Sequence, residues 1–417
     1  MSEWKEYKLG EIAEIIPGFA FKSKEFGKIG ELVIKIKDIN PPYIILSAME
    51  RVDTSSYPKD KLGKYKLAKG DFVVAMTGAT IGKVGKLKTD VLAYINQRVA
   101  KIKAKNCVCN DFIYYSISTE QFQAFIRNNI DSNTAQENIS AISIGKFPIL
   151  LPPLLEQTAI ASILSSLDDK IDLLHRQNAT LEKMAETLFR QWFIEEAKEE
   201  WESRPLSSIA NFLNGLACQK FPPKNDIEKL PVLKIKELNS GISENSDWAT
   251  TEVNPEYIVK NGDVIFAWSA SLMVKIWDGQ DCILNQHLFK VTSEYYPKWF
   301  YYLWCKYHLD EFIVKAASHA TTMGHIKRSD LDEAMVLIPS DKELEEMTLA
   351  VEPLISKIIS NNKQIKLLVN LRDILLPKLM SGEIRVESHR DETSVETNND
   401  TATLSPIGAA YKTNQHG

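Results

Sequence analysis

The sequence predicts a mixed α/β protein with two pseudo-repeated α/β domains, separated by two long helices that pair as an antiparallel coiled coil. Three observations support this fold class. Two long segments carry apolar residues in a heptad rhythm, both segments keep the same phase, and the stretches that precede them share short motifs in the same order. A heptad rhythm marks a narrow apolar seam along a helix, and such a seam packs against a neighbouring helix.

The first heptad segment lies near the middle of the chain, and its seam positions alternate steps of four and three residues. They are Ile160, Leu164, Leu167, Ile171, Leu174, Asn178, Leu181, Ala185, Leu188 and Trp192. A helix over residues 156–193 would be roughly 57 Å long at about 1.5 Å per residue. This is far longer than the average helix of a globular protein, so the segment needs a partner.

The second segment repeats this seam 187 residues further on. Its positions are Met347, Val351, Leu354, Ile358, Asn361, Ile365, Leu368, Arg372, Leu375 and Leu379. The shared phase makes each segment the natural partner of the other, although two unrelated helices on separate domains are the alternative. Asn178 and Asn361 lie on the seam, where polar residues often fix the register of pairing. Pro353 stands where the first segment has Ser166, which implies a kink or a late helix start.

The stretches before the two helices form an internal repeat. The matching stretches are 4–13 with 201–210, 33–40 with 232–239, 69–75 with 261–267, 95–98 with 284–287, and 147–152 with 334–339. Alternation at 33–40 and 232–239 is typical of a strand with one solvated face. The third pair predicts a turn that enters a buried strand, and the last pair predicts a short strand closed by proline just before each long helix.

The repeat and the heptads together divide the chain into five parts. They are a first domain over 1–152, a first long helix over 153–197, a second domain over 198–340, a second long helix over 341–382, and a tail over 383–417. Within the domains, aromatic stretches at 112–130 and 299–317 predict helices. The end of the chain is rich in Ser, Thr, Asn, Asp and Glu with almost no apolar pattern, which predicts disorder.

The composition is that of a soluble globular protein, with 44% hydrophobic and 25% charged residues. No apolar run approaches the ~18 residues that a membrane-spanning helix needs, and the N-terminus lacks the apolar core of a signal peptide. We therefore expect a cytoplasmic protein that makes no membrane contact. The five cysteines show no metal-ligand spacing and are expected to be reduced thiols.

The net charge of −5 is unevenly distributed. Residues 1–150 hold 22 Lys and Arg against 16 Asp and Glu, which gives +6, whereas residues 198–340 hold 15 against 19, which gives −4. A basic first domain suits a polyanionic partner, but the second domain gives no such indication. The alternating lysines of the strands predicted at 33–40 and 232–239 fit an ordinary solvated face as well as a phosphate track. These are Lys35, Lys37, Lys234 and Lys236.

Two motifs resemble catalytic sites but lack the rest of the machinery. Asn-Pro-Pro-Tyr at residues 40–43 is the signature with which amino-methyltransferases hold a target adenine, yet the chain has no glycine-rich S-adenosylmethionine loop. The second half has a different turn sequence at 239–242, so a tight turn explains both copies. Residues 78–84 resemble a phosphate loop but lack its spacing, which favours a hairpin turn. The seven histidines show no ligand spacing, so neither metal nor acid–base chemistry is predicted.

Two further motifs resemble those of a known family. LLPPLLEQ at residues 150–157 precedes the first long helix, and LLPKLMSGEIRV at 375–386 closes the second. Together with the duplicated order of domain and helix, they resemble the DNA-specificity subunit of type I restriction-modification systems over about residues 1–386. The resemblance implies that each domain is a target-recognition domain that reads one half of a split DNA site. It also implies that the helices space the domains and dock the modification subunits.

The resemblance further implies a non-catalytic chain that binds double-stranded DNA and assembles with two methyltransferase subunits and with restriction and translocase subunits. S-adenosylmethionine, ATP and Mg²⁺ would bind to those partners, and this chain would hold no cofactor. Two other functions stay open from the residues alone. One is a self-sufficient adenine methyltransferase that uses Asn40 to Tyr43, and the other is a coiled-coil assembly protein that binds a ligand other than DNA. Because the second domain is acidic, we expect the partner subunits to supply much of the positive surface against DNA.

Side chains that read bases should differ between two domains that read different sequences, whereas side chains that hold the fold or grip phosphate can be shared. The pairs Asn96-Gln97 and Asn285-Gln286 could contact adenine, but their presence in both halves favours a structural or phosphate-facing role. The differing candidates lie in loops rich in Gly, Ser, Thr and Asn. They are Met76, Thr77, Thr80, Lys83, Arg98, Asn133, Thr134, Gln136 and Asn138 in the first domain, and Trp268, Ser269, Ser271, His287, Thr321, Thr322 and His325 in the second.

Overall fold

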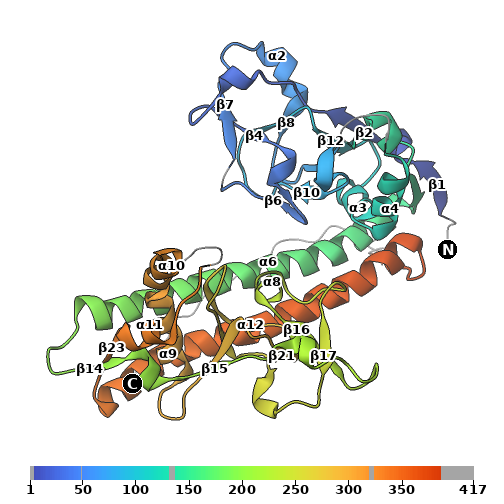
Figure 1. Ribbon diagram of the computed structural model, residues 1–417. Coiled ribbons are helices and arrows are strands. Elements are labelled where there is room, and N and C mark those ends of the chain that lie inside the picture. Colours follow the sequence, from blue (N-terminus) through green and yellow to red (C-terminus); the bar gives the residue numbers. More distant parts are fainter. Residues whose placement is uncertain (1–3, 48, 131–136, 319–323, 387–417) are drawn as a thin grey trace, which may run out of the picture.

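A computed structural model describes residues 4–47, 49–130, 137–318 and 324–386 of the chain. Its two longest helices, α6 (Leu154–Arg190) and α12 (Asp341–Ser381), lie side by side through the molecule. The first domain, in blue, sits above this pair in Figure 1, and most of the second domain lies below it. In the described residues, no helix is both long and apolar enough to cross a membrane.

The two long helices run antiparallel, as the heptads predict. Arg372 of α12 pairs with Asp168 of α6 at 3.1 Å, and further along α6 the amide of Asn361 donates to Asn178 at 2.9 Å. Asn178 in turn donates to Asn362 at 2.6 Å. Partner numbers on α12 therefore fall as numbers on α6 rise. Asn361 is fully buried, so this amide contact restricts the helices to one register.

The ends of α12 follow from local chemistry. Ser340 caps its first turn and exchanges hydrogen bonds with Glu343, and Gly382 ends the helix with a φ of +76°, a conformation that glycine adopts easily. The late helix start that Pro353 suggested is wrong, because the helix begins at Asp341 and continues through this exposed proline. The first long helix ends differently, in a π-helical segment, η5 (Gln191–Glu195).

The two ends of the helix pair carry equivalent clamps. At one end, Glu156 accepts hydrogen bonds from the Trp4 indole at 3.1 Å and the Arg385 guanidinium at 2.7 Å. At the other end, Glu343 accepts from the Trp201 indole at 3.1 Å and pairs with Lys198. Of the tail predicted to be disordered, residues 383–386 thus return to the start of α6, and residues 387–417 lie outside the described part of the chain.

The first domain is built from short strands and helices around a six-stranded and a five-stranded sheet, with β1 and β13 forming a separate two-stranded sheet. Its strands are β1 (Lys5–Lys8), β2 (Ala13–Pro17), β3 (Phe26–Gly27), β4 (Glu31–Ile34), β5 (Ile39–Asn40), β6 (Tyr43–Ile44), β7 (Glu50–Val52), β8 (Lys66–Leu67), β9 (Phe72–Ala75), β10 (Val84–Lys86), β11 (Ala93–Ile95), β12 (Val99–Ala104) and β13 (Pro148–Leu151). Its helices are α1 (Leu9–Ile12), η1 (Ser23–Glu25), η2 (Ile36–Asp38), α2 (Lys59–Leu62), η3 (Gly63–Tyr65), η4 (Gly78–Thr80), α3 (Asn110–Ser116), α4 (Glu120–Asn128) and α5 (Ala141–Ile144).

The second domain repeats this order with fewer strands. Its strands are β14 (Glu202–Pro205), β15 (Asn211–Asn214), β16 (Lys229–Leu233), β17 (Trp248–Thr250), β18 (Ile258–Val259), β19 (Val264–Ala267), β20 (Met273–Ile276), β21 (Cys282–Leu284), β22 (Leu288–Thr292) and β23 (Met335–Ile338). Its helices are α7 (Leu206–Ile209), η6 (Cys218–Lys220), α8 (Ile235–Ser240), η7 (Pro255–Tyr257), α9 (Lys298–Tyr307), α10 (Leu309–Ser318) and α11 (Arg328–Glu333).

The sheets of the two domains have matching topology. The order β2-β12-β9-β10 in the first domain corresponds to β15-β22-β19-β20 in the second, and β7-β4-β11-β8 corresponds to β17-β16-β21-β18. In both domains the first strand of the repeat pairs with the last, β1 with β13 and β14 with β23. The first domain extends its sheets with β3 at one edge and the β6-β5 hairpin at another.

One strand prediction is wrong in both halves. The stretch 33–40 leaves β4 after Ile34, because the Asp38 carboxylate accepts the Lys35 backbone N–H at 2.8 Å and turns the chain into η2. The matching stretch leaves β16 after Leu233 and enters α8. Lys35 and Lys37 do not alternate along a strand, and both pair with Glu50.

Candidate nucleic-acid interface

Three candidate stretches of the first domain come together at one place. The loop after β9 meets the turn between β11 and β12, where Met76 N–H donates to the Arg98 carbonyl at 2.9 Å. The same loop meets the chain before α5, where Gly78 N–H donates to the Glu137 carbonyl at 3.0 Å and Ile139 N–H donates to the Met76 carbonyl at 3.0 Å. We call residues 76–83, 96–98 and 137–141 the first loop cluster.

The second domain assembles the equivalent stretches in the same way. Trp268 N–H points to the His287 carbonyl at 3.4 Å, Ala270 N–H donates to the Gly324 carbonyl at 2.8 Å, and Ile326 N–H donates to the Trp268 carbonyl at 3.1 Å. Residues 268–272, 285–287 and 324–328 form the second loop cluster. The isolated bridge between Thr77 and Asn138 has its counterpart between Ser269 and His325.

The shared Asn residues belong to the framework of these clusters. Gly18 and Gly215 each pass so close to the Asn turn that an added Cβ would lie 2.1 Å from the Asn96 carbonyl oxygen and 2.3 Å from that of Asn285. Only glycine fits such an approach without a backbone shift. Asn285 is 3% exposed and Asn96 is half-buried, whereas Gln97, the neighbour of Asn96, is exposed. The framework therefore fixes the position of the residue that follows each Asn-Gln pair.

In the first loop cluster, the cationic candidates face solvent and several others do not. Lys83 and Arg98 are exposed. Met76 is 8% exposed and packs in the core of the domain. The hydroxyl oxygens of Thr77 and Thr80 are buried and find no hydrogen-bond partner among the described residues. These two buried hydroxyls of the first loop cluster can therefore each form a further hydrogen bond.

The second loop cluster is aromatic where the first is cationic. The Trp268 ring stacks on Phe289 with centroids 5.6 Å apart, and its indole N–H donates to Asn214 at 3.1 Å. The rings of His287 and His325 lie 5.9 Å and 6.4 Å from the Trp268 ring. Ser269 is buried with its hydroxyl 3.1 Å from His287 Nδ1, and Ser271 is exposed.

Five candidates lie outside the described residues and stay predictions from sequence alone. They are Asn133, Thr134, Gln136, Thr321 and Thr322.

Comparison with known proteins identifies the family. The sequence matches the type I restriction modification DNA specificity domain over residues 1–183 and 198–370, which is most of its length. The chain belongs to this family. It is 28% identical over 416 residues to the type I restriction enzyme MjaIX specificity subunit of Methanocaldococcus jannaschii, covering 92% of this chain and 94% of that protein.

Two further relatives agree with this assignment. The type I restriction enzyme EcoBI specificity subunit of Escherichia coli is 23% identical over 434 residues, covering 92% of this chain and 87% of that protein. The fold is similar to the crystal structure of the type I restriction-modification S subunit from M. genitalium, with a TM-score of 0.58 at 15% identity over 90% of this chain and 96% of that one. As a specificity subunit, the chain is a recognition component and not an enzyme.

The Asn-Pro-Pro-Tyr motif of this specificity subunit is a hairpin turn that rests on the helix pair. Residues 40–43 join β5 to β6, and the Tyr43 hydroxyl donates to the Asp168 carbonyl at 3.4 Å. The Tyr114 hydroxyl donates to the Pro42 carbonyl at 3.0 Å. The motif therefore connects the first domain to α6, as a tight turn would, and the methyltransferase interpretation is not favoured.

Sequence reasoning missed two residues of the second loop cluster. Lys327 and Arg328 come two and three residues after His325 and are exposed at the start of α11. Their counterparts 187 residues earlier are Ser140 and Ala141. Alignment of the two halves beyond His325 would have revealed this difference in charge.

Proposed function

We propose that this specificity subunit reads a two-part DNA site, one part with each loop cluster. The observation that supports this most directly is the antiparallel pairing of α6 and α12. The first domain packs on the start of α6 and the end of α12, through Ile160, Leu164 and Leu379. The second domain packs on the opposite end of the pair, through Phe189 and Val351. Two equivalent reading surfaces held apart on one rigid support suit two short sites with an unread gap between them.

The second part of the proposal concerns partners. We propose that two methyltransferase subunits dock on the helix pair, and that restriction and translocase subunits join them. The pseudo-repeat supports a count of two, because each half of the chain offers an equivalent combination of domain and helix. S-adenosylmethionine, ATP and Mg²⁺ would then act in the partner subunits.

A methylation map of host DNA with and without this gene tests the proposal. We expect adenine marks at a two-part motif that disappear when the gene is deleted and its methyltransferase partners are still expressed. An unchanged map would contradict the proposal. Binding of S-adenosylmethionine to the isolated chain is the second readout, because a self-sufficient methyltransferase would bind it and this proposal predicts no binding.

A further inference from the structure

We propose that Lys327 and Arg328 are the phosphate-contacting cations of the second domain. The inference rests on the proposed function and goes beyond it, because it identifies how a net-acidic domain meets DNA with its own side chains. The positive charge that the first domain carries in two loops would be supplied, in the second domain, from the start of a short helix. Partner subunits would then not be needed to provide it.

The structural equivalence of the two positions is close. Ser140 caps α5 and Lys327 occupies the cap position of α11, and each follows a residue whose N–H bonds to the loop after the buried strand, Ile139 to Met76 and Ile326 to Trp268. The same backbone position therefore carries Ser-Ala in the first loop cluster and Lys-Arg in the second. Because the two halves share this backbone arrangement, the change from Ser-Ala to Lys-Arg alters the charge and leaves the backbone conformation the same.

The two loop clusters carry their Lys and Arg residues in different segments. The first loop cluster has Lys83 and Arg98 in its loops. The equivalent loop of the second cluster, residues 268–272, has the sequence WSASL and no Lys or Arg, and His287 stands where the first has Arg98. Each cluster thus holds two strong cations, but from different segments. Phosphate contacts dominate the affinity of proteins for DNA, so a domain without them would bind weakly.

Eight of the thirteen lysines in residues 198–340 form ion pairs. Lys198 and Lys306 pair with the long helices, and six pair inside the domain, namely Lys224, Lys229, Lys234, Lys275, Lys290 and Lys315. In contrast, neither Lys327 nor Arg328 forms an ion pair with a described residue. Two carboxylates of the same helix have other partners: Asp330 is buried and accepts the Lys327 backbone N–H at 2.6 Å, and Asp332 accepts from Ser207.

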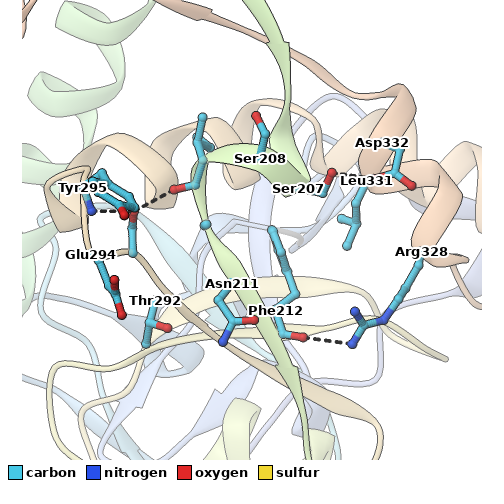
Figure 2. Close-up of a pocket in the computed structure, with 13 residues that line it drawn as sticks. Ser207, Ser208, Asn211, Phe212, Thr292, Glu294, Tyr295, Arg328, Leu331 and Asp332 are labelled. Atoms are coloured by element: carbon cyan, nitrogen blue, oxygen red, sulfur yellow. Dashed lines mark hydrogen bonds between the residues drawn. The ribbon is translucent and has the colours of Figure 1, made fainter.

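Arg328 is also held in place by the ring stack of the cluster. Its guanidinium carbon lies 6.0 Å from the centre of the Phe289 ring, which is the ring that stacks on Trp268. Figure 2 shows the Arg328 side chain reaching the Phe212 carbonyl, to which it donates at 3.3 Å, at the rim of an open pocket of about 600 Å³. The one carbonyl leaves most of its five donors available, and the pre-positioned fork suits a phosphate oxygen. Glu294 and Asp332 line the same pocket and make its interior unfavourable for an anion, so a phosphate would contact Arg328 at the edge of the pocket.

The test is the salt dependence of DNA binding by the complex of the full chain with its methyltransferase subunits. The probes are a duplex with the motif from the methylation map and a duplex of equal length with both parts scrambled. Lys327→Ser with Arg328→Ala installs the residues of the first half, so the backbone should tolerate the change. The slope of log K against log salt should become shallower by about 2, since each lost phosphate contact removes about 0.9. Preference for the motif duplex should persist.

Lys224→Ala with Lys260→Ala is the matched control, because it removes two exposed cations that lie outside the second loop cluster, one of them paired with Glu252. The control should keep the wild-type slope. If the Lys327 and Arg328 variant behaves like the control, the inference is overturned. If wild-type complex binds both duplexes equally, the proposed function itself fails. Should the double variant not assemble, Lys327→Ser alone decides the question, with a slope change of about 1 expected and no change contradicting the inference.

Discussion

The two halves of the molecule agree at their loop clusters and differ where their domains meet the helices. Both clusters use the same backbone contacts around a glycine and an Asn-Gln turn, so only side chains distinguish them. At the junctions with α6 and α12, however, the first domain adds a buried ion pair to its apolar contacts, whereas the second adds a cluster of aromatic rings. Two domains that read different sequences need the same loop backbone with different side chains. Attachment of a domain to the helix pair can instead be achieved by several kinds of contact.

The first junction has a buried polar group and a cavity beside its apolar contacts. Asp168 is buried and accepts from the Tyr115 hydroxyl at 2.8 Å and from Arg372 at 3.1 Å. A cavity of about 330 Å³ lies beside this group, between the Pro41-Pro42 turn and the helix pair. At the corresponding helix positions, the second half has Ile355 and Ala185, which are both fully buried.

The second junction is filled by rings. Phe189 of α6 packs against Trp304 with centroids 4.9 Å apart and against Phe193 at 5.0 Å. Polar contacts lie at its margin, where Glu182 of α6 pairs with Lys306 and accepts from the Tyr302 hydroxyl at 3.0 Å. The difference teaches that buried apolar area fixes both domains to the helices, and that the first junction adds a hydrogen-bonded ion pair that burial makes sensitive to the loss of either partner.

The largest effect should come from Phe189→Ala. Removing this 4% exposed ring leaves a cavity between α6 and the second domain, and the free energy of unfolding should fall by about 3–5 kcal/mol. Leu376→Ala changes the same position of α12, where the side chain is half-buried and already lines a cavity, and should cost only about 1–2 kcal/mol. Urea unfolding followed by tryptophan fluorescence measures both. Equal losses of unfolding free energy in the two variants would contradict the proposed difference between the junctions.

Arg372→Ala should have the next largest effect. It leaves the Asp168 carboxylate buried with Tyr115 as its remaining side-chain donor, which should lower the free energy of unfolding by about 2–3 kcal/mol, since the pair is partly exposed. The double change Asp168→Ile with Arg372→Ala reproduces the apolar pair of the other half. It should recover most of the loss in the same unfolding experiment, and a double variant less stable than Arg372→Ala alone would contradict this explanation.

The smallest effect concerns the two clamps, which are alike in both halves. Lys198, with Ser340 and Trp201, lowers the pKa of Glu343 from 4.5 to about 2, and Arg385 lowers the pKa of Glu156. Because the folded-state pKa is depressed, the stabilisation is fully present above the ordinary carboxyl pKa and is lost as pH falls toward the folded value. Glu343→Gln should therefore lower stability at neutral pH by about 1 kcal/mol or less.

Thermal midpoints of wild-type protein and Glu343→Gln, measured at steps from neutral pH down through the carboxyl range, check this sign. The difference between the two proteins should shrink as the pH falls, and Glu156→Gln should behave alike at the other end. A difference that widens with acid would show that the clamp carboxylates do not bind these cations in solution.

Sequence periodicity was sufficient to predict the two long helices, because every heptad of a paired helix places apolar residues at the same seam positions. Comparison of the two halves was sufficient for the repeat, and turn-forming residues in both halves were sufficient for the tight turn at residues 40–43. Periodicity failed where one side chain overrides an alternating pattern, as Asp38 does when it ends β4 by accepting the Lys35 N–H. The buried contact of Asp168 with Arg372 could not be predicted, because it depends on which residues of two distant helices come to face each other.

The candidate site was partly accessible from sequence for a similar reason. Comparing the halves identified loops that the fold brings together, such as Thr77 with Asn138 and Ser269 with His325. The same comparison could not tell that Met76 is a core residue, since a loop sequence gives no measure of burial. It also did not include Arg328, because the proximity of this residue to the Phe289 ring is visible only in the structure.

The central claim is that the two loop clusters read separate parts of one DNA site, and methylation maps of two single variants test it most directly. Arg98 and His287 occupy equivalent turns of the two clusters and are both exposed. Arg98→Ala should relax sequence preference by about 10- to 100-fold, equivalent to about 1–3 kcal/mol, at one part of the motif only. His287→Ala should relax the other part only. Relaxation of the same part by both variants, or a motif without two separable parts, would contradict the account.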